Sequence, residues 1–374
     1  MEERKSILIV VDDLYVGGIQ RIALDHLYNL SDQGLDCLLV CLSPVDYRRS
    51  SMVEVDENFF LPYSARVLYT SKKWLNQLRS IFKLHNRHRF SLILCHSPRA
   101  NLLTRILKVF TFSRFKIVAF IHQVPSFSSK KQNFKRGMYF RFADFVWAGS
   151  NQFRLEINRL RSESLFYRFI FRNDVVFERP GIYLRRINFM QDSSKISRID
   201  KRALVFYGRA VAWKGFEVFL SLTGNLEKRD TSYVLTSKEY SSVFVPDRSE
   251  FAARIEVIVA KSIASVQWPN LAIHVYPTDY GNSTKFPMSI SLNVLECVAL
   301  GIPSIISYEA YESWPEFQNS ILCKMTTWEK SETFEIIAEL QNAPTSIFLE
   351  EAKKLRNVIS IEHQCNRIIG LVNS

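Results

Sequence analysis

A short basic segment in the second half of the chain has the residue types of an anion-binding site. It reads Gly208-Arg209-Ala210-Val211-Ala212-Trp213-Lys214-Gly215. An apolar run precedes it and a helical pattern follows it, so we expect the order strand, loop, helix start. Helix N-termini attract anions, and Arg209 and Lys214 would add a planar guanidinium and a mobile ammonium suited to a diphosphate. Gly208 and Gly215 would allow close approach of the backbone. The segment alone is equally compatible with a surface turn that holds two cations.

A second segment places a carboxylate in an apolar helix. Glu296 lies within an expected helix over residues 291–300, which is followed by Gly301-Ile302-Pro303 and a strand. Its neighbours in the helix are mostly leucine, valine and alanine, and a carboxylate in such surroundings needs a polar partner. This favours a functional role for Glu296 over an exposed position on the helix.

The first half contributes glycines and histidines at strand ends. Gly17 and Gly18 follow the first apolar run, and a tight turn into a helix would need them with or without a ligand. His96 and His122 each end an expected strand. From the residues alone, we expect His96 to be structural and His122 to bond a backbone carbonyl.

The elements that would position these residues alternate between strand and helix. In the first half we expect strands at 7–11, 37–42, 92–96, 117–122 and 145–149, and helices at 18–33, 73–88, 101–110 and 151–161. After a polar linker at 191–199, we expect strands starting at 203 and at 233–236, 272–276 and 304–307, with helices at 250–262, 291–300, 333–340, 346–358 and 361–372. This alternation is typical of parallel sheets covered on both faces. The prediction is two doubly wound domains, with ligands bound at the carboxyl ends of the strands.

Composition limits the class of protein. A chain of 374 residues with 47% hydrophobic residues can form two large cores. No apolar run is long enough to span a membrane, and the chain starts without a secretory pattern. The six cysteines are scattered without a Cys-x-x-Cys pair, so we expect buried, reduced thiols and a cytoplasmic location.

The formal net charge of +12 is concentrated in the first half. Residues 58–143 contain no Asp or Glu, and aromatic residues alternate there with Lys and Arg. Such a one-signed surface predicts an anionic partner, namely a membrane surface, a diphosphate-linked substrate or a nucleic acid. No nucleic-acid module signature is present, so we do not expect nucleic acid as the partner.

The order of these motifs along the chain resembles glycosyltransferase family 4, the retaining enzymes with the GT-B fold. The motifs are Gly17-Gly18, the strand-end histidines, the Gly208–Gly215 segment, and Glu296 followed by Ala299-Leu300-Gly301-Ile302-Pro303. The likeness covers nearly the whole chain. It implies two Rossmann-like domains that face each other across a cleft, at residues 1–190 and 200–360. It also implies that residues 361–374 pack back on the first domain.

The resemblance also implies roles. Arg209 and Lys214 would bind the donor diphosphate and stabilise the leaving group, and His122 would lie near the transferred sugar. Glu296 would accept hydrogen bonds from the ribose, while Gly17, Gly18 and Gly208 would line the donor site. Backbone N–H groups at Ser289, Ile290, Ser291 and Leu292 would face a phosphate or the sugar. The chemistry would need no metal or other cofactor, so we interpret Asp12-Asp13 as a strand-end or helix-capping pair.

One position departs from the family pattern. A second glutamate is usual eight residues before Glu296, and this chain has Met288 there. We therefore hypothesise a donor sugar with fewer hydroxyls, such as a deoxyhexose.

The predicted function is transfer of a hexose or deoxyhexose from a nucleotide-sugar to a growing glycan carried on a lipid diphosphate. This would serve surface polysaccharide, lipopolysaccharide or O-antigen synthesis at the inner face of the membrane. Two alternatives stay open: a non-catalytic relative that scaffolds glycan assembly, and a nucleic-acid-binding protein that uses the basic half.

Overall fold

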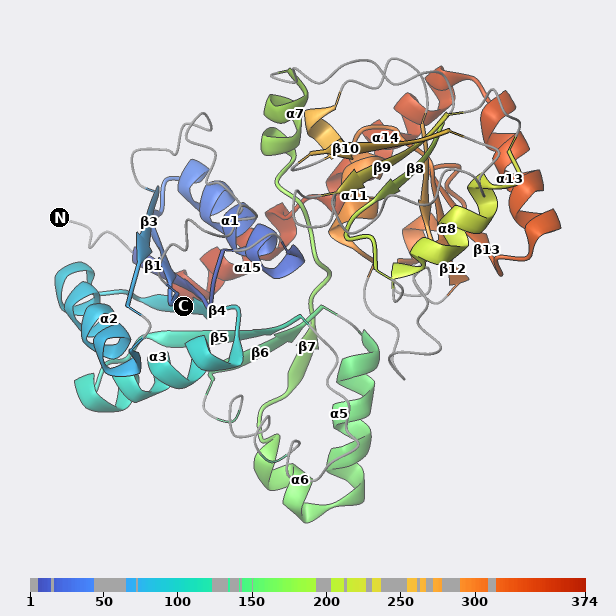
Figure 1. The fold of residues 1–374 in the computed structure, drawn as a ribbon. Helices are drawn as coiled ribbons and strands as arrows, with labels where there is room; N and C mark the ends of the chain where they lie inside the picture. The colour runs from blue at the N-terminus through green and yellow to red at the C-terminus, as the bar shows by residue number, and fades with distance from the viewer. Residues whose placement is uncertain are drawn as a thin grey trace. The chain divides into compact units, whose positions relative to one another are not determined.

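The structure is a computed structural model. It describes residues 6–14, 17–43, 65–71, 73–122, 134, 141, 143–149, 151–192, 203–211, 214–226, 231–236, 254–260, 263–266, 272–277, 290–308 and 314–374. The chain divides into two compact units, one formed by Met1–Tyr183 with Ile361–Ser374 and the other by Leu184–Ser360. Each unit contains a parallel sheet (Figure 1).

The first unit has a seven-stranded sheet in the order β3-β2-β1-β4-β5-β6-β7. Its strands are β1 (Ser6–Val11), β2 (Asp36–Cys41), β3 (Ala65–Tyr69), β4 (Leu92–Cys95), β5 (Lys116–Ile121), β6 (Phe145–Ala148) and β7 (Val175–Phe177). All neighbouring strands pair in parallel. The residues of β1 and β4 are fully buried because helices cover both faces of this sheet.

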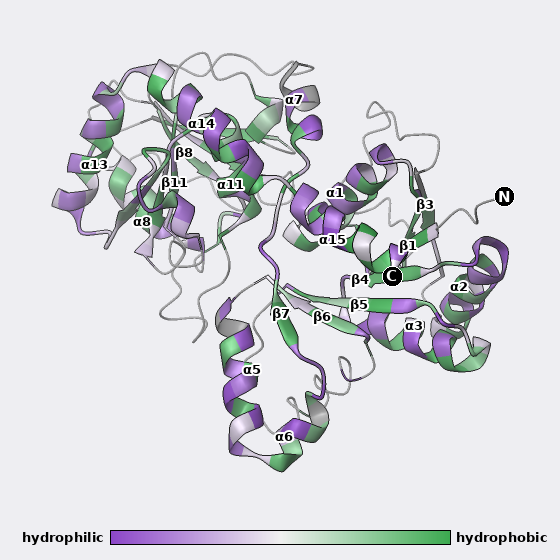
Figure 2. Ribbon diagram, turned by 180° about the vertical axis from the view of Figure 1, so that it is seen from behind, coloured by the Kyte–Doolittle hydropathy of each residue, from purple (hydrophilic) through white to green (hydrophobic). Residues whose placement is uncertain are grey.

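The helices of the first unit are α1 (Gly18–Asp32), α2 (Trp74–His88), α3 (Pro98–Thr111), α5 (Asn151–Glu163), α6 (Leu165–Ile170) and α15 (Glu362–Asn373). Figure 1 shows α1 and α15 on one face of the sheet and α2 and α3 on the other. In Figure 2 the strands are mainly hydrophobic, whereas the helices carry hydrophilic residues between their hydrophobic ones. This is the pattern of helices that bury one side only.

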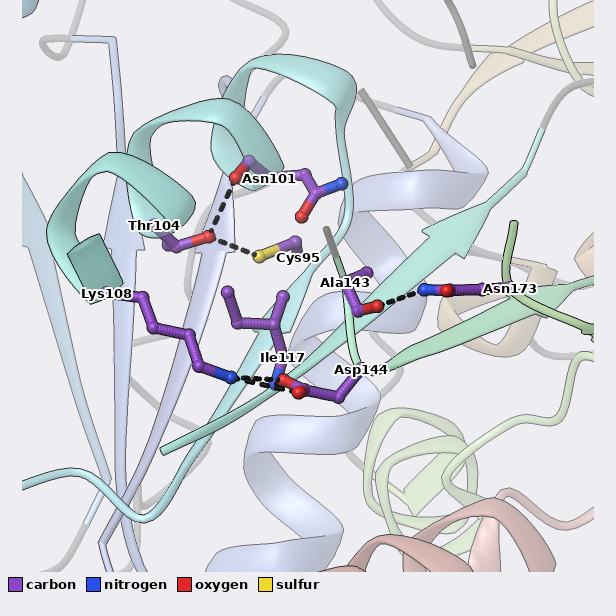
Figure 3. A network of polar contacts seen from close by, with 8 residues as sticks. All are labelled: Cys95, Asn101, Thr104, Lys108, Ile117, Ala143, Asp144 and Asn173. Atoms are coloured by element: carbon purple, nitrogen blue, oxygen red, sulfur yellow. Dashed lines mark hydrogen bonds and ion pairs between the residues drawn. The ribbon is translucent and has the colours of Figure 1, made fainter. Parts of the chain in front are cut away.

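Polar contacts hold α3 to the strands beneath it (Figure 3). The carboxylate of Asp144 accepts hydrogen bonds from the backbone N–H of Ile117 at 2.6 Å and from Nζ of Lys108 at 2.8 and 2.9 Å. One turn earlier in the helix, Sγ of Cys95 lies 3.2 Å from Oγ1 of Thr104. These contacts fix α3 relative to β4 and β5.

The second unit has a six-stranded sheet in the order β10-β9-β8-β11-β12-β13. Its strands are β8 (Leu204–Tyr207), β9 (Thr231–Thr236), β10 (Arg254–Val259), β11 (Ile273–Tyr276), β12 (Ser304–Ser307) and β13 (Cys323–Thr326). Its helices are α7 (Leu184–Asp192), α8 (Phe216–Thr223), α11 (Leu292–Ala299), α13 (Lys330–Asn342) and α14 (Thr345–Ile359). Two short 3-10 helices span Ile263–Ser265 and Pro315–Phe317.

One expected helix is wrong. Within residues 250–262 the structure has the strand β10, which pairs along its whole length with β9. Four of its six residues are Ile or Val, and β-branched residues favour a strand because they fit the pleated surface. Our expectation gave weight to a helical spacing of apolar residues that the pairing with β9 overrides.

The start of the second unit differs from the position that we expected. The division falls between Tyr183 and Leu184, so α7 belongs to the second unit. The physical reason is that α7 packs on that unit, where Ile187 is buried and Arg186 pairs with Glu296. The expected linker at 191–199 begins inside α7 and otherwise lies outside the described residues.

The helix α15 is part of the first unit. Nε2 of Gln364 donates to the backbone carbonyl of Arg179 at 2.7 Å, and Arg367 forms an ion pair with the buried Glu178. The guanidinium of Arg367 also lies 5.2 Å from the centre of the Trp147 ring. No helix within the described residues is long and apolar enough to cross a membrane.

Candidate functional site

The candidate residues lie where the strand order reverses in each sheet. In the first unit the chain runs outward from β1 toward β2 and later restarts at β4, so the reversal lies between β1 and β4. In the second unit it lies between β8 and β11. Open parallel sheets bind ligands beyond the carboxyl ends of the strands at such reversals. Gly17, Gly18 and His96 follow β1 and β4, while Gly208, Arg209 and Lys214 follow β8.

The first turn of α11 packs against the end of β8. Nδ2 of Asn293 donates to the backbone carbonyl of Tyr207 at 2.7 Å. Gly208 has φ +143°, and a Cβ atom there would lie 3.1 Å from Nδ2 of Asn293. The space that a side chain at Gly208 would need is therefore filled by Asn293, which brings the start of α11 beside the basic segment.

The other end of the basic segment packs against the end of β11. Gly215 has φ +70°, and a Cβ atom there would lie 1.8 Å from the carbonyl oxygen of Pro277. Nζ of Lys214 donates to the hydroxyl of Tyr276 at 2.6 Å and lies 5.0 Å from the centre of its ring. Arg209 is exposed to solvent, and Lys214 is partly buried. The two ends of the segment are thus held against α11 and β11, and Arg209 lies on the exposed surface between them.

Glu296 is fully buried and is held by polar partners. Its Oε2 accepts a hydrogen bond from the hydroxyl of Tyr207 at 2.9 Å, and its Oε1 lies 3.3 Å from a guanidinium nitrogen of Arg186. The expectation from sequence that this carboxylate needs a polar partner is thereby confirmed.

The first turn of α11 is capped by its own residues. Ser291 is the N-cap residue, and its Oγ accepts from the backbone N–H of Asn293 at 3.3 Å, while its carbonyl accepts from the N–H of Val294 at 3.0 Å. Ile290 and Leu292 are buried on either side of Ser291. Ser289 and Met288 lie outside the described residues.

In the first unit, the two aspartates after β1 have partners that connect β1, α1 and α3. Oδ1 of Asp12 accepts from the hydroxyl of Ser97 at 2.7 Å, and Ser97 also caps α3. Oδ1 of Asp13 accepts from Nε2 of Gln20 at 2.8 Å. Both aspartates thus have strand-end positions, whereas the N-cap of α1 is Gly17. Burial raises the pKa of Asp12, which the hydrogen bond from Ser97 partly offsets.

His122 belongs to a cluster of aromatic rings after β4 and β5. Its Nε2 lies 2.9 Å from Nδ1 of His96. His96 stacks on Phe120 with ring centres 4.5 Å apart, and the ring centre of His26 in α1 lies 5.3 Å from that of His96. Burial lowers the pKa of His26 to about 3 and that of His122 to about 4, and it holds the pKa of His96 well below its usual range. All three imidazoles are therefore neutral at neutral pH.

Several residues of the two clusters were not singled out in the sequence. Tyr276 bonds to Lys214, Asn293 bonds to the carbonyl of Tyr207, and the hydroxyl of Tyr207 bonds to Glu296. Arg186 pairs with Glu296. Tyr207 and Tyr276 are the last residues of adjacent strands, and this placement could have indicated them. Arg186 carries no local signal because its contact depends on the packing of α7.

Among the residues that the structure describes, no group of three or more His, Cys, Asp or Glu side chains is placed to hold a metal ion. Cys37, Cys41, Cys95, Cys297, Cys323 and Cys365 are all buried and free, as we expected from their apolar contexts. Burial raises the pKa of the thiol of Cys41 to about 11, so it remains protonated.

No protein-family model and no curated protein matches the sequence. Solved structures match over the whole chain. The chain is similar to HepE of Anabaena in complex with UDP, at 13% identity over 99% of both chains, with a TM-score of 0.66. It is also similar to an alpha-glucosyltransferase in complex with UDP and a 13-mer DNA, at 13% identity over 99% of both chains, with a TM-score of 0.68.

A third similar structure is the sucrose-phosphate synthase of Thermosynechococcus elongatus, at 11% identity over 99% of this chain and 98% of that one, with a TM-score of 0.64. These neighbours are glycosyltransferases of the GT-B fold. The chain therefore has the GT-B fold, an α/β architecture with two Rossmann-like parallel sheets, and this part of the sequence prediction is confirmed.

Proposed function

We propose that this protein is a glycosyltransferase that takes its sugar from a nucleotide-diphosphate donor. The observation that carries the proposal is the cluster around the end of β8. There, Arg209 and Lys214 follow the strand, and the buried Glu296 is joined to the same strand end through Tyr207. The fold is shared with glycosyltransferases that hold UDP, which supports the same class of donor here.

The roles follow from the charge that develops during transfer. When the bond between the sugar and the diphosphate breaks, negative charge accumulates on the diphosphate oxygens. Fixed cations stabilise that charge more than they stabilise the bound donor, and this difference accelerates the reaction. Arg209 and Lys214 supply those cations, and no metal is required. Glu296 accepts hydrogen bonds from the ribose, the role that the family resemblance implies for it.

The remaining roles are proposed on the family resemblance. Gly17 and Gly18 belong to a loop that contacts the donor from the first unit, and His122 hydrogen-bonds the transferred sugar. The backbone at Ser289, Ile290, Ser291 and Leu292 contacts the phosphate or the sugar. Transfer proceeds with retention of configuration, as in glycosyltransferase family 4.

A panel of UDP-, GDP- and dTDP-sugars tests the donor class by thermal shift. A nucleotide that binds only the folded protein stabilises it by about 2.7 kcal/mol at a concentration of 100 times its Kd. We expect one nucleotide base to raise Tm, and Lys214→Ala to reduce that shift. Lys353→Ala, which removes an exposed lysine from α14, is the matched control. A panel in which no nucleotide-sugar shifts Tm would refute the proposal.

The identity of the transferred sugar is a separate part of the proposal. Because Met288 replaces the usual glutamate, we propose a deoxyhexose as the transferred sugar. Once the base is known, donors that differ only at the sugar are compared by kcat/KM. A clear preference for glucose or galactose donors would remove this part of the proposal.

We propose a lipid-diphosphate-linked glycan at an anionic membrane as the acceptor. Support comes from an open hollow in the first unit lined by Lys73, Trp74, Leu75, Asn76, Arg79 and Arg99. Trp74 and Leu75 are about half exposed there, so cations and apolar side chains share one surface. At the end of α3, Phe110 is 70% exposed and Phe112 is 93% exposed, close in sequence to Lys108 and Arg114. Basic residues beside exposed aromatics are typical of peripheral membrane binding.

Co-sedimentation with vesicles tests the membrane. We expect binding to vesicles with anionic lipid, weaker binding in high salt, and weaker binding after Phe110→Ser with Phe112→Ser. Ile347→Ser, at an exposed apolar position of the second unit, is the control. Equal binding to neutral vesicles would contradict the proposal.

A nucleic acid is the second candidate acceptor. One structural neighbour holds DNA, and the first unit of this chain is strongly basic. Salt-sensitive binding to an oligonucleotide, without binding to anionic vesicles, would favour this candidate.

A further inference from the structure

The buried imidazoles of the first unit form hydrogen bonds that allow only one arrangement of protons. The chain of contacts begins at the backbone carbonyl of Arg179, which can only accept. Nε2 of Gln364 donates to it at 2.7 Å, so the amide orientation of Gln364 is determined. The other amide atom, Oε1 of Gln364, lies 2.9 Å from Nε2 of His26. Because this oxygen can only accept, His26 carries its proton on Nε2.

The other ring nitrogen of His26, Nδ1, is a buried acceptor without a hydrogen-bond partner among the described residues. With the proton on Nε2, this unpaired atom is a bare lone pair. Buried N–H groups without a partner are rarer and more costly in proteins than unpaired acceptors.

The same reasoning determines the tautomer of His96. Its Nε2 is also buried without a partner among the described residues, and the ring is only 1% exposed. A proton on Nε2 would leave a buried N–H without a hydrogen-bond partner, at a cost in free energy. The proton of His96 therefore lies on Nδ1, the atom that faces Nε2 of His122 at 2.9 Å.

His122 must then accept at Nε2, which leaves its own proton on Nδ1. We propose that His96 is the positioning residue that holds His122 in the Nδ1–H tautomer, so that His122 presents an N–H donor beyond the carboxyl end of β5. His122 is partly exposed, so a donor on this side chain can face a ligand.

The proposal changes the chemistry expected of His122. An imidazole whose Nδ1 carries the proton and whose Nε2 accepts from His96 has no free lone pair for a general base. His122 therefore donates a hydrogen bond to an oxygen of the ligand and does not remove a proton. Only the identity of that oxygen as a sugar hydroxyl rests on the proposed function. The tautomer is a property of the ligand-free protein.

Nuclear magnetic resonance of protein labelled with ¹⁵N in its seven histidines tests the proposal without ligand. Couplings from the two ring nitrogens to the ring protons distinguish the tautomers, and the His122 signals are assigned by their loss in His122→Asn. We expect Nδ1–H in His122 and Nδ1–H in His96. Nε2–H in His122 would overturn the proposal, whatever the outcome of the donor panel.

Two variants of His96 distinguish the effect of its Nδ1–H donor from the effect of its ring packing. The amide nitrogen in His96→Asn can replace Nδ1–H, so His122 should keep its tautomer. His96→Phe keeps a ring against Phe120 but removes the donor, so the ratio of Nδ1–H to Nε2–H in His122 should fall about fivefold or more. An unchanged ratio in His96→Phe would refute the role of His96.

His85→Phe is the matched control. His85 is another buried histidine of the first unit, bonded to Ser113 at 2.9 Å, and it is not a partner of His122. The His85→Phe variant should leave the His122 signals unchanged. If His96→Phe does not fold, the wild-type and His96→Asn spectra still decide the tautomer.

Discussion

The two units place a candidate cluster at the same point of a parallel sheet, but they stabilise it by opposite means. The cluster of the first unit consists of neutral imidazoles and Phe120 with a single arrangement of protons. The cluster of the second unit is charged: Glu296 is paired with Arg186, and Arg209 and Lys214 follow the strand β8 whose last residue bonds to Glu296. The structure of the first cluster therefore depends on which ring nitrogens carry protons, whereas that of the second depends on the pairing of opposite charges.

The largest expected effect is on the buried ion pair of the second unit. Arg186→Met leaves the fully buried Glu296 without its counter-ion, and removal of one member of a buried pair costs about 3 kcal/mol or more. We expect a clear decrease in the denaturant midpoint, and most of it should be recovered in Arg186→Met with Glu296→Gln.

Arg159→Met is the control for this pair. Arg159 forms exposed ion pairs with Glu156 and Glu163, and such pairs contribute little to stability. If Arg186→Met costs no more than Arg159→Met, Arg186 is not the counter-ion that the structure indicates.

The next effect is on catalysis. Removal of a preplaced charge that stabilises a leaving group costs about 100-fold in kcat. We expect this loss in Lys214→Ala, measured as donor hydrolysis or transfer, with little change in Tm. Unchanged rates would remove Lys214 from the leaving-group site and favour the non-catalytic alternative.

The third prediction concerns the stability of the folded protein at acidic pH. His26 and His122 in the first unit and His274 in the second have pKa values of about 3, about 4 and about 3, because burial disfavours their charged forms. The unfolded chain, with histidine pKa values near 6.5, binds more protons than the folded chain below that pH. Stability therefore falls as pH decreases from about 6.5 toward 3, by about 2 kcal/mol at pH 5 for His26. Asp12, whose pKa is raised, opposes this trend.

The two units should differ in this response. The first contains His26, His96 and His122, whereas His274 is the one histidine of the second unit in the printed sequence. Hydrogen exchange at about pH 7 and about pH 5, corrected for the intrinsic rates, should show a larger loss of protection in β1, β4 and β5 than in β8 and β11. An equal loss in both units would contradict this difference.

The smallest effect is expected at His122. His122→Asn can keep a donor at the position of Nδ1, whereas His122→Ala loses it. We expect about a tenfold lower kcat for the alanine variant and a smaller decrease for asparagine, since one hydrogen bond is at stake. A larger loss in the asparagine variant than in the alanine variant would argue against the donor role.

Much of the fold could be predicted because apolar runs and helical spacing are local signals. The strands β1, β2, β4, β5 and β12 and the helices α1, α2 and α14 agree with expectation to within one or two residues. The strand β10 could not be predicted from periodicity, because its conformation depends on pairing with β9. The short strands β3, β7 and β13 were not expected either, since each has only three to five residues.

The candidate site was predictable to the extent that its residues have a distinctive type in a distinctive place. A carboxylate in an apolar helix and cations after a strand meet that condition, as Glu296 and Arg209 do. The pairing of Glu296 with Arg186 is a tertiary contact between α7 and α11, and no spacing in the sequence specifies it. The tautomer of His26 depends on Gln364, which is distant from it in sequence.

That distance has a consequence for how the protein is made. Gln364 follows His26 by 338 residues, so a ribosome that adds about 5–20 residues per second delivers it on the order of tens of seconds later. During that interval β1, β4 and β5 can already form a sheet, but α15 is missing and the imidazole of His26 is without its acceptor. A nascent chain halted before α15 should therefore show the first unit incompletely folded, although all seven strands of its sheet have already been synthesised.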